Sequence, residues 1–179
     1  MPAIEIRPAV LNDLPALSAI EHSFETLYTW QMDRNIDESQ VMVNFREIRL
    51  PRPVRVEYPR SLDFLGGDGF QQSVILTALL GGSPVGYLRM KEEQEPRTAW
   101  IKDLGIRKDA RRQGIASVLI LAAQDWAAQR TLKRVIIEAQ SRNVAAIRLI
   151  AKLGYEFCGY NDHYYASQDI ALFFARYLR

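Results

Sequence analysis

The sequence predicts an α/β domain in which helices flank a mixed β-sheet. Three observations lead to this class. Short β-rich runs alternate with amphipathic stretches of helical spacing, a strand meander lies in the middle of the chain, and the 179 residues are 48% hydrophobic and 25% charged. That composition is enough to bury one full core, so we expect a single domain spanning residues 1–179.

The first predicted elements are a short strand and a helix. Apolar residues alternate with polar ones over residues 4–8, which indicates a strand. Asn12 or Asp13 can then cap a helix in which apolar residues recur at near-helical spacing over 14–20. Pro15 falls in the first turn of that helix, where proline is compatible with the helical backbone.

The pattern becomes irregular over the next part of the chain. Two alternating runs, at residues 41–45 and 54–58, are separated by a tetrapeptide with two prolines at 50–53. Alternation indicates extended backbone, and the prolines interrupt it. We therefore expect an atypical extended segment, or arm, inserted into the domain at about residues 29–68.

A three-strand meander follows the arm. Residues 73–80 form a β-rich run, Gly81-Gly82 is a two-residue hairpin signal, and residues 85–90 continue as a second strand. Residues 98–106 supply the third strand. Such a meander predicts antiparallel pairing between consecutive strands.

The most regular helix pattern begins at Gly114 and continues to Trp126. Apolar residues fall on one face along its whole length, so this helix should pack against a sheet. That predicted face consists of Ile115, Val118, Leu119, Ala122 and Trp126.

The rest of the chain completes the α/β order. Residues 135–137 are predicted to form a short buried strand, and residues 143–152 a helix. Gly154, just past the last turn of that helix, is a typical helix-ending glycine. Residues 155–159 and 170–178 read as two further strands. The strands and helices together predict a mixed sheet.

Composition restricts the functional classes. The formal net charge of +2 is too small to indicate nucleic acid or a membrane surface as a partner. The single cysteine, Cys158, cannot form an intrachain disulfide, and no run approaches the roughly 18 apolar residues of a membrane span. There is no signal-peptide pattern, so we expect a cytoplasmic protein, and we assign no metal site.

The turn between the strand at 98–106 and the following helix is the clearest candidate site. A loop that ends a strand and opens a helix points backbone N–H groups and the positive helix terminus at one place, which suits a phosphate. Gly114 lacks the Cβ that would obstruct a ligand there. Basic residues gather near this turn and fit an anionic cofactor: Arg107, Lys108, Arg111 and Arg112.

The turn resembles a known family signature. Its spelling Arg111-x-x-Gly114-x-Ala116 is similar to the pyrophosphate-binding motif of the GNAT acetyltransferases, which move an acetyl group from acetyl-coenzyme A to an amine. The stretch from Asn143 to Tyr155, with its Lys-x-Gly-Tyr ending, resembles the second family signature. The resemblance implies a GNAT-type, mostly antiparallel sheet and an N-acetyltransferase activity.

The resemblance also implies which residues bind acetyl-coenzyme A or coenzyme A. Backbone amides of 113–117 would hold the pyrophosphate, and the strand at 104–106 would present backbone groups to the pantetheine and the acetyl carbonyl. Strand glycines often mark a bulge or a close backbone approach, which singles out Gly105 independently. The expected cofactor-binding residues are Leu104, Gly105, Ile106, Arg111, Arg112, Gln113, Gly114, Ile115, Ala116, Ser117, Asn143 and Lys152.

Several of these residues also have a purely structural interpretation. Asn is a preferred helix N-cap, so Asn143 could serve only that role. Lys152 could simply interact with the helix dipole at the C-terminal end. One of the two adjacent arginines, Arg111 or Arg112, could be a solvated loop residue.

Catalysis requires a proton acceptor for the amine and a proton donor for the thiolate. Asp103 and Glu138 are the candidate bases, although Asp103 could instead pair with Lys102 or with an arginine on a neighbouring strand. Ile150 stands where the family commonly has a tyrosine, so the acid must come from elsewhere. Four tyrosines downstream are candidates, Tyr155, Tyr160, Tyr164 and Tyr165, and we favour Tyr164 or Tyr165. Two further candidates are Asp162 and His163; we interpret the other histidine, His22, as a polar residue of the first helix.

The acceptor is expected to be a primary amine of a small molecule or peptide, attacked directly on the acetyl group. Two alternatives remain open at this point: acetylation of a protein N-terminus or lysine through a groove formed by residues 30–58, and a non-catalytic coenzyme A sensor or scaffold. Acidic residues facing the substrate would favour a small cationic amine. The extended arm could exchange between subunits, which makes a homodimer a possible assembly.

Overall fold

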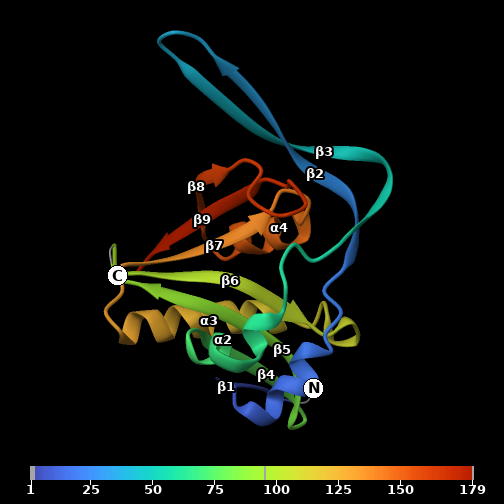
Figure 1. The fold of residues 1–179 in the computed structure, drawn as a ribbon, viewed down its shortest axis with the longest axis vertical. Coiled ribbons are helices and arrows are strands. Elements are labelled where there is room, and N and C mark those ends of the chain that lie inside the picture. The colour runs from blue at the N-terminus through green and yellow to red at the C-terminus, as the bar shows by residue number, and fades with distance from the viewer. Residues whose placement is uncertain (1–2, 95, 179) are drawn as a thin grey trace.

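A seven-stranded mixed sheet forms the centre of the computed structural model, which describes residues 3–94 and 96–178 (Figure 1). The strand order is β1-β4-β5-β6-β7-β9-β8. The strands are β1 (Ile4–Pro8), β4 (Val74–Leu80), β5 (Ser83–Glu93), β6 (Thr98–Ile106), β7 (Arg134–Gln140), β8 (Glu156–Asn161) and β9 (Ala171–Tyr177).

One pair of strands in this sheet is parallel. β6 and β7 run in the same direction, and the other neighbouring strands are antiparallel. The helix α3 (Ile115–Gln129) makes the crossover between the two parallel strands, as a parallel pair requires. The predicted mixed and mostly antiparallel sheet is therefore confirmed.

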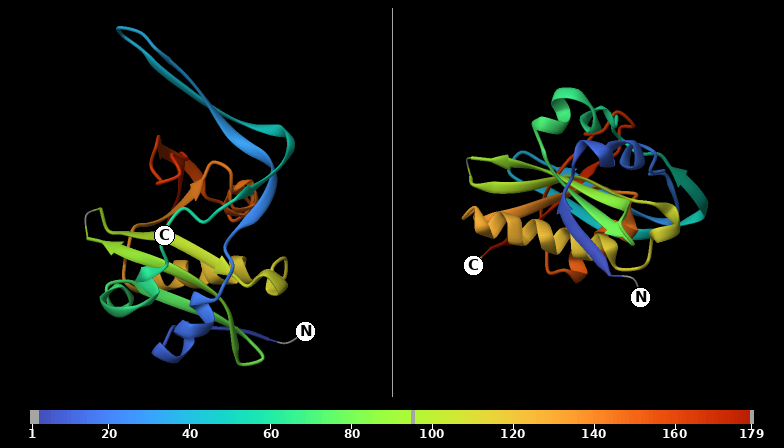
Figure 2. Two further views of the ribbon diagram at one scale, coloured as in Figure 1. Left: turned by 45° about the vertical axis from the view of Figure 1, so that its right-hand side comes forward. Right: turned by 90° about the horizontal axis from the view of Figure 1, so that it is seen from below.

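Helices cover both faces of the sheet (Figure 2). α3 and α4 (Val144–Lys152) contribute to the larger core, in which Leu119 and Ile147 are fully buried with residues of the central strands. On the opposite face α1 (Leu14–Ser18) and the 3₁₀ turn η2 (Asp63–Leu65), followed by α2 (Gly67–Gln71), pack around Tyr87 of β5. Two separate apolar layers thus hold the sheet in place.

The apolar face of α3 is rotated from the predicted one. Ile115 and Leu119 are buried as expected, but the face continues through Ile120, Ala123 and Ala127. Val118 is 36% exposed, so it lies at the edge of the interface. Because almost every position of this helix is apolar, hydrophobic spacing alone did not define the buried side.

The segment predicted as an arm folds into a long hairpin that projects beyond the main sheet (Figure 1). Its strands, β2 (Phe24–Ile36) and β3 (Val41–Val56), form a separate antiparallel two-stranded sheet. β3 runs through both prolines of 50–53 without ending, because the register shifts there between Thr26 and Tyr28 of β2. Proline is tolerated at such an irregular place in a ladder.

The predicted turns and caps were mostly found. Gly81 and Gly82 both have positive φ, as a two-residue hairpin turn requires. Asn143 caps α4 by accepting a hydrogen bond from the N–H of Ala146 at 3.2 Å, and Gly154 has φ of +80° just past the helix. The first helix differs. The carboxylate of Asp13 accepts a hydrogen bond from the N–H of Val10, the residue before the 3₁₀ turn η1 (Leu11–Asp13), and does not cap α1.

Among residues 3–94 and 96–178, we find no helix that combines the length and the apolar character needed to cross a membrane.

Candidate active site

The sheet opens where its two parallel strands separate. β6 and β7 are paired only from Thr98 with Arg134 to Ile101 with Ile137. Beyond these residues β6 continues with β5, while β7 continues with β9. A bulge at Lys102 in β6 marks this point, since Ile101 and Asp103 are opposite consecutive residues of β5. The two strands therefore diverge into a V-shaped opening.

A cleft of about 940 Å³ occupies this opening. Its walls are the separated ends of β6 and β7, the first turn of α3, α4 and the base of the arm. All but one of the predicted cofactor-binding residues line it; Gln113 does not. The lining includes Leu104, Gly105, Ile106, Arg111, Arg112, Gly114, Ile115, Ala116, Ser117, Asn143 and Lys152.

The turn before α3 has the geometry expected of an anion site. Gly114, at the N-cap of α3, has φ of +82°, and Arg112 also has a positive φ of +66°. Alternating backbone conformations of this kind direct successive N–H groups inward. The helix start has no side-chain cap, and a Cβ on Gly114 would meet no described atom within 4 Å. Exposed N–H groups beside an open space fit the diphosphate of coenzyme A.

The two arginines of the motif have different surroundings. The guanidinium of Arg111 donates to three backbone carbonyls, those of Ile106 at 3.0 Å, Ser23 at 3.3 Å and Glu21. It therefore ties the loop before β2 to the end of β6. Arg112 is exposed at the cleft and is the better placed of the two to meet a phosphate.

The second motif lies on the opposite wall of the cleft. Asn143 uses its side-chain oxygen as the α4 cap, and Lys152 is exposed in the last turn of that helix. Ile150 also lines the cleft, although it is only 2% exposed. The phenol that the family commonly carries at this position is therefore absent from the cleft wall.

Asp103 is enclosed by basic and phenolic side chains. Its carboxylate is fully buried and accepts from Nε and Nη2 of Arg89 at 2.5 Å each, while the hydroxyl of Tyr58 donates to its other oxygen. Arg60 lies at 3.5 Å from that oxygen. Asp103 thus has an arginine partner on the neighbouring strand, as the structural interpretation of this residue anticipated.

Glu138 occupies the same cluster from the β7 side. Its buried carboxylate pairs with Lys102 at 2.9 Å and with Arg60. The hydroxyls of Tyr164 and Tyr165 each lie 3.4 Å from it. Tyr165 is buried and lines the cleft, whereas Tyr164 is not part of the lining. The predicted catalytic residues are therefore brought together, and Arg60 connects the two carboxylates.

Burial changes the proton affinities in this cluster. It lowers the pKa of Lys102 to about 8, and the nearby guanidinium of Arg60 acts in the same direction. Burial raises the pKa of Tyr165 and that of Tyr58. Both phenols therefore stay protonated at neutral pH.

Sequence reasoning missed two parts of the site, the base of the arm and His22. Residues 24–28, Tyr58 and Arg60 line the cleft because the arm starts and ends beside β6. His22 also lines the cleft and lies in the loop after α1, not on the helix. His163, by contrast, has a side chain that is 68% exposed and lies outside the cleft.

The fold and the cleft, with its anion-suited turn, fit a transferase that takes its group from a diphosphate-containing donor. The chain belongs to the acetyltransferase (GNAT) family, whose family model matches residues 25–155. The family, the fold class and the enzyme class predicted from the sequence are thereby confirmed.

Comparison with individual proteins gives more distant similarities. The streptothricin acetyltransferase of Streptomyces lavendulae is 24% identical over 166 residues, which are 90% of this chain and 86% of that protein. A crystal structure of nourseothricin acetyltransferase has a TM-score of 0.83 at 19% identity and covers 99% of both chains. A streptothricin acetyltransferase structure from Bacillus anthracis, in complex with acetyl coenzyme A, has a TM-score of 0.78 at 21% identity, covering 98% of this chain and 100% of that one. Acetyl-coenzyme A as the cofactor agrees with that complex.

Proposed function

We propose that this enzyme transfers the acetyl group of acetyl-coenzyme A to an amine of a small cationic acceptor of the streptothricin class. The carboxylates at the acceptor side of the cleft are the main observation in support. Glu25 lines the large cleft, and Glu21 and Glu57 line a smaller cavity of about 300 Å³ beside it. Glu57 is paired with Arg55 at 2.6 Å, so the attraction for a cation is due mainly to Glu21 and Glu25. Carboxylates favour a cationic acceptor, because opposite charges attract across the cavity.

The base of the arm also favours a small acceptor over a protein. Residues 24–28 form a wall of the cleft, and the backbone N–H of Trp30 donates to the carbonyl of Ser141 at 2.8 Å. Arg148 of α4 pairs with Glu47 of β3 and lies over the ring of Tyr28. These contacts fasten the arm to α4 and to the loop before it, on the side where a polypeptide groove was considered.

The cofactor is proposed to bind between the first turn of α3 and α4. The N–H groups at the start of α3 would hold the diphosphate, and Leu104 to Ile106 of β6 would face the pantetheine and acetyl group. When bound, acetyl-coenzyme A supplies the activated acetyl group. Asp103, Glu138 and Tyr165 lie at the catalytic centre in this proposal: the two carboxylates hold Arg60 and Lys102 beside the cleft, and Tyr165 is the proton donor to the departing thiolate.

A panel of acceptors tests the proposal. Purified enzyme with acetyl-coenzyme A should release free thiol in the presence of streptothricin and form a monoacetylated product by mass spectrometry. A peptide with a free N-terminus and a lysine-containing peptide should give at most background release. Acetylation of the peptides but not of streptothricin would contradict the small-molecule assignment. An absence of turnover with any amine would contradict the acetyltransferase activity.

We also propose that a second copy of the chain is the partner of the arm tip. Ile36, Val41 and Met42 at the tip are 59%, 66% and 47% exposed. Apolar side chains grouped on a projecting hairpin suit an interface between protomers. Sedimentation should show that the wild type is a dimer and that the variant with all three residues replaced by serine is a monomer. If the wild type and the variant both sediment as monomers, the proposed interface is contradicted.

A further inference from the structure

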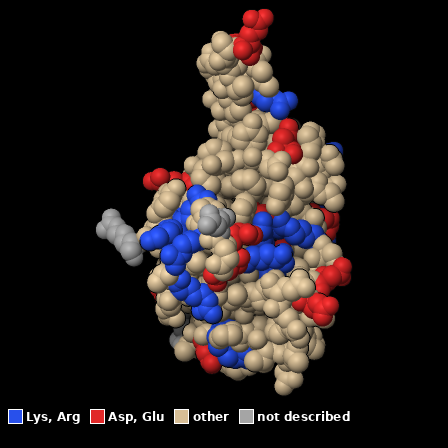
Figure 3. All heavy atoms as spheres, turned by 60° about the vertical axis from the view of Figure 1, so that its left-hand side comes forward, with Lys and Arg blue, Asp and Glu red and all other residues tan. Residues whose placement is uncertain are grey.

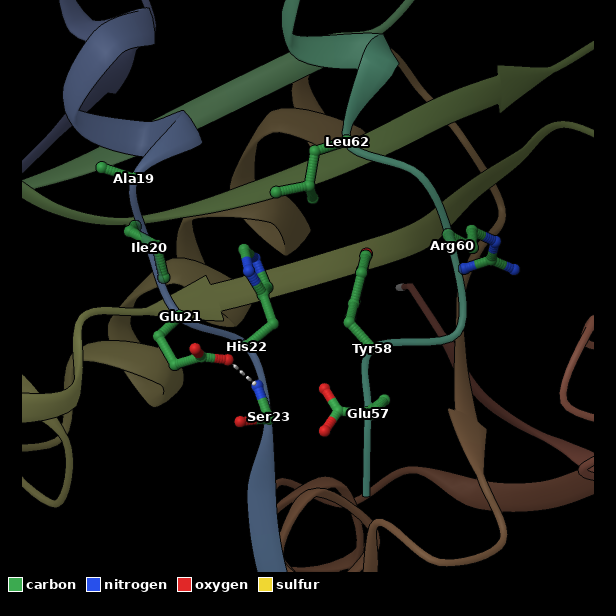
Figure 4. Close-up of a pocket in the computed structure, with 9 residues that line it drawn as sticks. All are labelled: Ala19, Ile20, Glu21, His22, Ser23, Glu57, Tyr58, Arg60 and Leu62. Atoms are coloured by element: carbon green, nitrogen blue, oxygen red, sulfur yellow. Dashed lines mark hydrogen bonds between the residues drawn. The ribbon is translucent and has the colours of Figure 1, made fainter. Parts of the chain in front are cut away.

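The small cavity and the large cleft meet at three side chains. His22, Tyr58 and Arg60 line both spaces. Figure 4 shows His22 and Tyr58 side by side, projecting in the same direction from two adjacent segments of chain. Their ring centroids are 4.5 Å apart. An acceptor amine bound in either space would therefore lie beside these groups.

Only one of the three can take a proton at neutral pH. Arg60 is a permanent cation. Tyr58 donates its hydroxyl proton to Asp103, and its raised pKa keeps it protonated. His22 is half-buried, and its burial lowers its pKa, so its imidazole is neutral and can act as a base.

The predicted bases are less accessible than His22. The carboxylates of Asp103 and Glu138 are fully buried and are each ion-paired with arginine. The oxygens of both carboxylates already accept from guanidinium, ammonium or phenol donors of the protein. Neither carboxylate is free to accept a proton directly from the amine.

The fold places His22 against the C-terminal end of β6. A Cβ on Gly105 would lie 2.4 Å from Nε2 of His22, so only glycine leaves room for the imidazole. Arg111 fixes the backbone on both sides of the histidine by bonding the carbonyls of Glu21 and Ser23. The close approach anticipated at this strand glycine is therefore made by a side chain of the protein.

The surroundings of His22 also suit its protonated form. Nε2 lies 2.9 Å from the hydroxyl of Tyr87, which can accept a hydrogen bond, and the backbone of Ile20 offers a second acceptor. The charges of Asp103 and Glu21 favour the imidazolium, and that of Arg111 opposes it. An imidazolium formed during the reaction would thus be hydrogen-bonded and partly balanced by charge.

We propose that His22 is the catalytic base that removes the proton from the acceptor amine. The proposal rests on the acetyl transfer proposed above. An ammonium N–H bond breaks, the proton goes to the unprotonated ring nitrogen of the neutral His22, and the electron pair left on the amine nitrogen forms the C–N bond with the acetyl carbon. The C–S bond breaks, coenzyme A leaves as thiolate and takes a proton from Tyr165. The second proton of the amine nitrogen is lost to solvent, from which Tyr165 is protonated again. His22 releases its proton to solvent.

Replacement of His22 tests this role with acetyl-coenzyme A and streptothricin as substrates. His22→Gln should lower kcat by about 100-fold, within the range typical of a general base. The dissociation constant for coenzyme A should change by less than about twofold, because the diphosphate site is on α3. The pH profile of the wild type should fall on the acid side below 6.5, and this limb should be absent from the variant.

Chemical rescue and a second histidine distinguish catalysis from a structural role. His22→Ala should regain activity when millimolar imidazole is added, whereas His163→Gln, at the exposed histidine, should match the wild type without it. The proposal is overturned if His22→Gln keeps both its rate and its acid limb, or if His22→Ala loses activity that imidazole does not restore. An inactive wild type would instead overturn the proposed function and this role together.

Discussion

Arg89 of β5 lies directly opposite Asp103 of β6, and its guanidinium binds the carboxylate that sits at the opening of the sheet. The Asp103 side chain is fully buried and that of Arg89 is 11% exposed. A charged pair in this position fixes the strand ends beside the cleft. It also explains how a carboxylate can occupy an otherwise apolar strand.

Removal of Arg89 should destabilise the protein strongly. Arg89→Met leaves the buried charge of Asp103 with only Arg60 and Tyr58, and breaking a buried pair typically costs about 3–5 kcal/mol. Urea denaturation measures the free energy of unfolding. The double variant Arg89→Met with Asp103→Leu should recover part of the loss; a single variant within about 1 kcal/mol of the wild type would contradict the role of this pair.

Tyr155 should contribute to stability through Gln124. Nε2 of Gln124 donates to the Tyr155 hydroxyl at 2.9 Å, and both residues are buried. Tyr155→Phe leaves this amide without its acceptor, which should cost about 1–3 kcal/mol at neutral pH.

The same tyrosine should make stability depend on alkaline pH. Burial raises the pKa of Tyr155 to about 12, from an ordinary value of 10. Its stabilising effect is fully present below pH 10 and is lost as pH rises from 10 to 12, because the unfolded chain ionises first. The deficit of Tyr155→Phe relative to the wild type should therefore shrink over that range, and a constant deficit would contradict the burial argument.

Tyr165 should affect turnover more than cofactor binding. It lines the cleft and its hydroxyl lies near Glu138, so Tyr165→Phe should lower kcat by about tenfold or more if it protonates the thiolate. Tyr164→Phe, a neighbour outside the cleft lining, should change kcat by much less. Steady-state kinetics on both variants checks this, and equal effects would argue against a specific role for Tyr165.

The sequence was most informative where local chemistry decides the structure. The strand at 98–106, the hairpin at Gly81-Gly82 and the Asn143 cap follow from alternation, positive φ and a side-chain hydrogen bond, all of which are local. The backbone geometry of the turn before α3 was predictable for the same reason, since one glycine and the following helix define it.

Long-range contacts explain what sequence reasoning missed. His22 and Asp103 are far apart in the chain, and Tyr58 joins them only because the arm returns to β6. The role of Arg111 depended likewise on carbonyls of a loop some 90 residues earlier. No periodicity or short motif reports such contacts.

The turn before α3 is proposed to bind the diphosphate, and calorimetry with coenzyme A on a matched pair of glycine variants is the decisive measurement. Gly114 and Gly81 both have positive φ and no described atom within 4 Å of an added Cβ, but only Gly114 lines the cleft. Gly114→Val should lower the affinity by at least about tenfold, while Gly81→Val, strained to a similar degree, should retain it. Equal affinities for the two variants, or no binding by the wild type, would contradict the account.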